Sequence, residues 1–123
     1  MAESETVIGE FATAKRLVEL LEDDGVQLDA AIWIPAEEGQ GRLYLVPRER
    51  SGGILDRTLR VAHTIARHRD ELPDAHELRY SAVNLDDPIV RAVLSSSGAS
   101  GRVRGVYNNG TYVDTAYIFR RAA

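Results

Sequence analysis

The chain has 123 residues, of which 44% are hydrophobic and 28% are charged, and it contains no cysteine. This size and composition are typical of one globular domain with a single core. The lack of cysteine excludes a disulfide framework, a thiolate metal site and a cysteine nucleophile. We therefore expect one domain over residues 1–123, working in a reducing compartment such as the cytoplasm.

Charge is unevenly distributed along the chain, whose formal net charge is −4. Residues 1–38 hold ten acids and two bases, residues 42–70 hold seven arginines and three acids, and residues 71–123 hold six of each. The first six residues are acidic and polar, and no apolar run approaches the roughly 20 residues that a membrane span requires. The sequence thus predicts neither export nor membrane insertion.

The first half of the chain predicts a helix followed by a β-hairpin. Residues 6–24 place Val7, Phe11, Ala14, Val18 and Leu21 on one helical stripe. Gly25 is expected to end this helix. Residues 26–34 alternate with period two, as a strand with one buried face does, and residues 43–46 are expected to return as the second strand of a hairpin.

A long helix is predicted next, over residues 54–72. Its apolar spacing indicates an inward stripe of Leu55, Leu59, Ala62, Ile65 and Ala66. The outward positions are then Asp56, Arg60, His63, Arg67 and Asp70. We expect the leucines of this helix to face the core.

The remaining elements are a strand, a short helix and a C-terminal hairpin. The strand is predicted over residues 78–83, and the short helix over residues 89–95 with Asp87 as N-cap and Pro88 at its first position. Asn109 and Gly110 separate two strand-like runs, and Asn-Gly is the strongest short hairpin signature. The complete prediction is an α+β fold of order αββαβαββ, a two-layer sandwich whose five-stranded, mostly antiparallel sheet carries its helices on one face.

One group of residues could bind an anion. Ser51, Gly52 and Gly53 precede the predicted long helix, whose free N–H groups and dipole favour negative charge. The arginines near this helix start are Arg48, Arg50 and Arg57. The same residues also fit an ordinary capped helix start, so the two interpretations remain open.

No sequence motif indicates catalysis, a metal site or a cofactor. The three histidines lack the spacing of helical metal ligands, and no nucleophile elbow is present. Asp114 alternates with apolar neighbours, and structural pairing with Arg102 or Arg104 is the favoured interpretation. Nucleic-acid binding is not favoured, because the chain is acidic and lacks an RNA-binding motif.

Two segments carry a family resemblance. They read Asn84-Leu85-Asp86-Asp87-Pro88 and Asp114-Thr115-Ala116-Tyr117-Ile118-Phe119-Arg120, and they accompany Ala31-Ile32-Trp33 and its hairpin. The chain resembles small bacterial proteins usually labelled hypothetical, from which it departs at Thr115 and Phe119. This resemblance implies a bacterial source and carries no activity.

These observations favour a non-enzymatic interaction or accessory module that binds another protein or a second copy of itself. Alternation predicts that Trp33 emerges on the exposed sheet face, where Tyr44 and Val46 join it as an interface patch. The alternative function is a small-molecule, nucleotide or anion-binding domain that uses the Ser51–Gly53 helix start and the nearby arginines.

Overall fold

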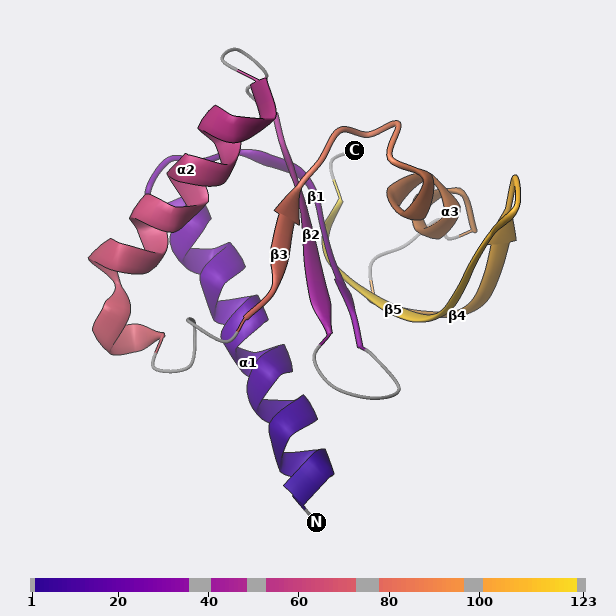
Figure 1. Ribbon diagram of the computed structural model, residues 1–123, viewed down its shortest axis with the longest axis horizontal. Coiled ribbons are helices and arrows are strands. Elements are labelled where there is room, and N and C mark those ends of the chain that lie inside the picture. Colours follow the sequence, from indigo (N-terminus) through magenta and orange to yellow (C-terminus); the bar gives the residue numbers. More distant parts are fainter. Residues whose placement is uncertain (1, 36–40, 49–52, 73–77, 97–100, 122–123) are drawn as a thin grey trace.

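The computed structural model describes residues 2–35, 41–48, 53–72, 78–96 and 101–121. Figure 1 shows three helices around one twisted sheet. In chain order the elements are α1 (Ala2–Asp23), β1 (Leu28–Ile34), β2 (Arg42–Pro47), α2 (Gly53–Arg67), the 3-10 helix η1 (Arg69–Glu71), β3 (Tyr80–Ala82), α3 (Pro88–Ser96), β4 (Gly101–Asn108) and β5 (Thr111–Arg121). The predicted α+β class is confirmed, and η1 is the one addition to the predicted order among the described residues.

The five strands form one open sheet of order β3-β2-β1-β5-β4. Three neighbouring pairs, β1 with β2, β1 with β5, and β4 with β5, are antiparallel. The pair β2 and β3 is parallel, with α2 in the connection between them. The sheet is therefore mostly antiparallel, as predicted, and β1 is its middle strand.

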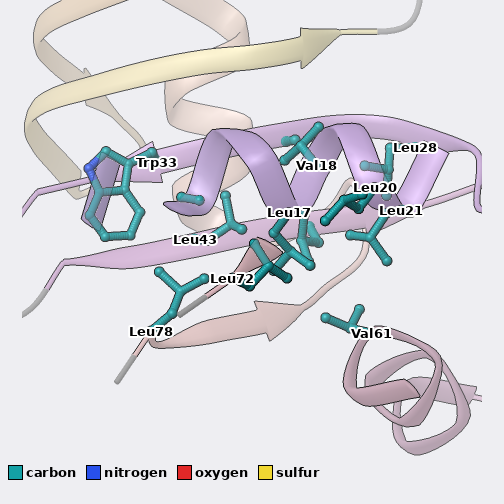
Figure 2. Close-up of a cluster of buried hydrophobic side chains, with 13 residues drawn as sticks. Leu17, Val18, Leu20, Leu21, Leu28, Trp33, Leu43, Val61, Leu72 and Leu78 are labelled. Atoms are coloured by element: carbon teal, nitrogen blue, oxygen red, sulfur yellow. The ribbon is translucent and has the colours of Figure 1, made fainter. Parts of the chain in front are cut away.

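The helices lie on both faces of the sheet, so the prediction that they share one face is wrong. Leu17 and Leu21 of α1 form one buried cluster with Val61 of α2 and with Leu43 and Trp33 of the sheet (Figure 2). The opposite face forms a second cluster, in which α3 packs on the sheet through Val90, Ala92 and Val93. The fold has three layers, and α3 lies over the distal β4–β5 hairpin (Figure 1).

This arrangement also corrects the predicted interface patch. Trp33 is only 1% exposed and lies at one end of the cluster under α1 (Figure 2). Tyr44 and Val46 point to the other face of the sheet, where they pack with the cluster beneath α3. The three side chains neither share a face nor form an exposed patch, because β1 is covered on both sides and has no solvent face.

Local chain signals act where they were predicted. Gly25 has φ +90°, and its N–H donates to the carbonyl of Glu22 while Val26 N–H donates to Leu21, the paired bonds of a Schellman helix end. Asp87 Oδ1 accepts from the N–H groups of Ile89 at 2.9 Å and Val90 at 3.2 Å, which is an N-cap.

The C-terminal hairpin turns at Asn109 and Gly110, with φ values of +49° and +84°. Positive φ at both central residues is the mark of a type I′ turn. Asn108 pairs with Thr111 across it. The predicted hairpin is confirmed.

Candidate functional site on helix α2

Helix α2 is rotated about its axis relative to the prediction. Its buried side chains among the described residues are Arg57, Val61 and Thr64, and Arg57 is only 4% exposed. Ile65, predicted to face inward, is partly buried against the same core. Arg57 donates from Nε to the carbonyl of Gly53 at 3.2 Å and from Nη1 to Oδ1 of Asn84 at 2.7 Å. A buried guanidinium must be hydrogen-bonded, and these partners determine which side of α2 turns inward.

The rotation leaves the predicted core leucines in solvent. Leu55 is 73% exposed and Leu59 is 49% exposed. Ala62 and Ala66 continue the same row at helical spacing, with Ala62 half-buried and Ala66 exposed. We call Leu55, Leu59, Ala62 and Ala66 the α2 stripe. It is an apolar row on the outer side of a helix whose inner side is partly polar.

The side of α2 between its stripe and its buried face lines a cleft of about 610 Å³. From α2 the cleft takes Arg60, His63, Thr64 and Arg67. The opposite wall consists of the turn between α1 and β1 together with the end of β2, and its residues are Asp24, Gly25, Val26, Gln27, Pro47 and Arg48. Among the described residues, three guanidinium groups and one imidazole line this cleft, and Asp24 supplies the one carboxylate of that lining.

Asp24 is held by side chains of α2 and of the turn that follows it. Its Oδ2 accepts from Thr64 Oγ1 at 3.0 Å, and its Oδ1 lies 3.0 Å from His68 Nε2. The other ring nitrogen of His68, Nδ1, lies 3.0 Å from Glu71 Oε2. The hydrogen bond to His68 lowers the pKa of Asp24, and the bonds to Asp24 and Glu71 raise the pKa of His68. The site therefore favours a carboxylate beside an imidazolium.

Glu71 continues this network to α1. It forms an ion pair with Arg16, and the hydrogen bond from Arg16 is the largest cause that lowers the pKa of Glu71. The network of Asp24, His68, Glu71 and Arg16 thereby links α1 and the turn after it to the segment that follows α2. Each titratable group of this network is paired with another side chain of the network, which favours a structural role over a catalytic one.

The predicted anion site is only partly visible. Arg50, Ser51 and Gly52 lie outside the described residues, and Gly53 begins α2 with φ +79°. Arg57 is buried against Asn84 and borders a separate hollow beside Asp86, whereas Arg48 lies on the wall of the large cleft. The structure does not bring Arg48 and Arg57 to one place.

The structure also bears on Asp114, on metal binding and on membrane insertion. The Asp114 carboxylate is exposed and accepts a long 3.4 Å hydrogen bond from the Tyr112 hydroxyl. Within the described residues it forms no ion pair with Arg102 or Arg104, so the favoured interpretation of pairing with these arginines is wrong. In the described part of the chain, no group of three or more His, Asp or Glu side chains is placed to hold a metal ion. Within the same residues, no helix has the length and apolar character needed to cross a membrane.

No family model, curated protein or solved structure matches this chain. Arg60, His63 and Arg67 were predicted to face outward, and their spacing of three and four residues was the available indication that they form one row.

Proposed function

We propose that this protein is a non-enzymatic interaction module that associates with a second copy of itself through the α2 stripe. The observation that carries the proposal is the orientation of α2, which exposes Leu55 and Leu59 while it buries Arg57. Exposed apolar rows of this kind, bordered by charge, are typical of binding surfaces. Two leucines in solvent are otherwise a cost in solubility.

The spacing of the stripe favours a second copy as the occupant. Its positions are separated by four, three and four residues, a pattern that reads the same in both directions. In an antiparallel pair related by a two-fold axis, Leu55 would face Ala66 of the second copy and Leu59 would face Ala62. Large side chains then meet small ones at every level, which lets two helices pack closely.

Charge on α2 is complementary in the same arrangement. The acidic residue of the first turn is Asp56 and the basic residue of the last turn is Arg67. Antiparallel pairing brings the first turn of one helix beside the last turn of the other, so that each end matches carboxylate with guanidinium. Opposite charges at the rim orient association and disfavour the parallel alternative.

Association through the edges of the sheet is less favoured. The β3 edge is only three residues long, and β4 carries the exposed Arg102 and Arg104 together with Gly105, whose φ is +60°. Short strands, charged side chains and distorted backbone are the means by which proteins block strand addition. Helix packing therefore accounts for association better than edge pairing.

The proposal also places the protein in the cytoplasm of a bacterium. The absence of cysteine supports a reducing compartment. The resemblance around Asp87 and Tyr117 supports a bacterial source. In that setting the protein would serve as an accessory subunit, with association in place of catalysis as its activity.

Sedimentation equilibrium tests the proposal directly. We expect the wild type to be a dimer and the variant Leu55→Ser/Leu59→Ser to be a folded monomer. The matched control is Tyr107→Ser/Tyr112→Ser, which removes two other exposed large side chains, 71% and 61% exposed, and should leave the dimer intact. A monomeric wild type, or equal weakening by both variants, would refute association through α2.

Charge reversal gives a test of the antiparallel arrangement. Asp56→Arg and Arg67→Asp should each weaken the dimer, and the double variant should recover most of the loss because the pair is restored in reversed order. Failure of the double variant to recover would show that these two side chains do not meet across the interface.

A further inference from the structure

We propose that the cleft between α2 and the α1–β1 turn is a binding site for a small phosphorylated molecule with at least two adjacent negative charges. This inference rests on the charged face of α2 and not on the stripe, and it shares only Arg67 with the proposed self-association. The cleft volume of about 610 Å³ falls within the range of roughly 300–1,000 Å³ common for small-molecule sites.

Cationic groups approach the cleft from both walls. The guanidinium groups of Arg60 and Arg67 come from α2, which also contributes the imidazole of His63, and the guanidinium of Arg48 comes from the end of β2. Arg48 is oriented by Asp29, whose carboxylate lies 2.9 Å from its Nε, and by Gln27 at 3.4 Å from its Nη1. A ligand in the cleft would therefore meet guanidinium groups on two sides.

The charge on the α2 wall is largely uncompensated. Within the described part of the chain, Arg60 and His63 make no hydrogen bond or ion pair. Arg67 reaches Asp24 only at 3.7 Å. The Asp24 carboxylate already accepts a hydrogen bond from Thr64 and lies 3.0 Å from His68 Nε2, so these two side chains engage both of its oxygens. Like charges gathered in this way repel one another, and a bound anion relieves the repulsion.

The lining selects the chemical class of the ligand. Guanidinium groups match the oxygens of phosphate in a fork geometry and hold them by charge-assisted hydrogen bonds. The described lining of the cleft includes no aromatic side chain on which a base could stack, and its larger apolar side chains are Val26 and Pro47. These features fit a compact diphosphate or bisphosphate better than a nucleotide held through its base.

Calorimetric titration with inorganic pyrophosphate at constant ionic strength tests the site. We expect saturable binding to the wild type and at least tenfold weaker binding to Arg60→Gln/Arg67→Gln. The matched control is Arg102→Gln/Arg104→Gln, which removes two exposed arginines of β4 outside the cleft and should bind as the wild type does. Circular dichroism verifies folding, and Arg60→Gln alone, at a side chain without partners in the described residues, should still weaken binding.

Three results would overturn the inference. They are no saturable binding by the wild type, equal loss in the cleft and control variants, and citrate binding as tightly as pyrophosphate at matched ionic strength. The last outcome would show recognition of charge without preference for phosphate. Because the readout is heat of binding and not molecular mass, failure here is distinguishable from failure of self-association.

Discussion

Replacing Gly41 with alanine should destabilise the fold sharply. A Cβ at Gly41 would lie 2.6 Å from Cζ2 of Trp33 and 2.7 Å from the carbonyl oxygen of Ile34, whereas ordinary contacts are 3.4–4 Å. Neither neighbour can yield easily, since Trp33 is fully buried and the oxygen belongs to the backbone of β1. Overpacking costs roughly 1–3 kcal/mol, and a clash on two sides places Gly41→Ala near the upper end, at about 3 kcal/mol.

Thermal unfolding measures this loss. An unfolding entropy of roughly 2.1 cal/mol/K per residue gives about 260 cal/mol/K for the whole chain, so that about 3 kcal/mol lowers Tm by about 12 °C. Gly25→Ala is the control, because a Cβ there meets nothing within 4 Å. Its cost of about 1 kcal/mol comes from the left-handed backbone alone. A Gly41→Ala protein that melts within about 3 °C of the wild type would refute the steric argument.

A double variant identifies the source of the clash. Trp33→Phe removes the Cζ2 and Cη2 atoms that a Cβ at Gly41 would meet, and it leaves the carbonyl oxygen of Ile34 in place. We expect the combined loss in Gly41→Ala/Trp33→Phe to be smaller than the sum of the single losses. Strict additivity would show that the indole ring is not the obstacle.

Three further predictions concern other parts of the fold. Asp87→Ala should cost about 1 kcal/mol in chemical denaturation, the usual size of an N-cap loss, with no dependence on calcium or magnesium. Gly110→Val should lower Tm clearly, because φ is +84° there and β-branched residues avoid that region. His68 has a pKa raised above its usual 6.5, so its contribution to folding stability is fully present below pH 6.5 and is lost as pH rises through the raised value. Asp24 has a pKa lowered below its usual 3.8, so its contribution to folding stability is present above pH 3.8 and is lost as pH falls through the lowered value. His68→Gln should flatten the decline of Tm at alkaline pH, and a pH profile of Tm equal to that of the wild type would contradict the role assigned to His68.

Features set by neighbouring residues could be predicted from the sequence. A glycine after a helix, an aspartate before a proline and an Asn-Gly pair each specify their own backbone, and all three act as expected at Gly25, Asp87 and Gly110. The strand order could not be obtained this way. The pairing of β5 with β1 joins Tyr117 to Trp33, and nothing local to either residue determines that contact.

The second helix-covered face was missed because β1 was interpreted by alternation. Residues 30–34 form an unbroken apolar run, which is the pattern of a strand buried on both sides. Reading that run as alternating assigned Trp33 to solvent and left α3 without a sheet face of its own. An apolar run on both faces of β1 requires a covering layer on each face. Because α1 covers only one of them, another helix must pack on the other, and that helix is α3.

The orientation of α2 was predicted wrongly for a different reason, and both proposals depend on the orientation that the structure shows. The leucine spacing indicated one buried face, yet the partners that draw α2 inward are Asn84 for Arg57 and Asp24 for Thr64, each remote in sequence. A helix that buries an arginine and exposes Leu55 breaks its own local pattern. Such conflicts between local preference and fold concentrate at functional surfaces. The orientation of α2 that places the stripe in solvent also directs Arg60 toward the cleft. The exposed apolar row and the cationic cleft therefore have the same structural cause.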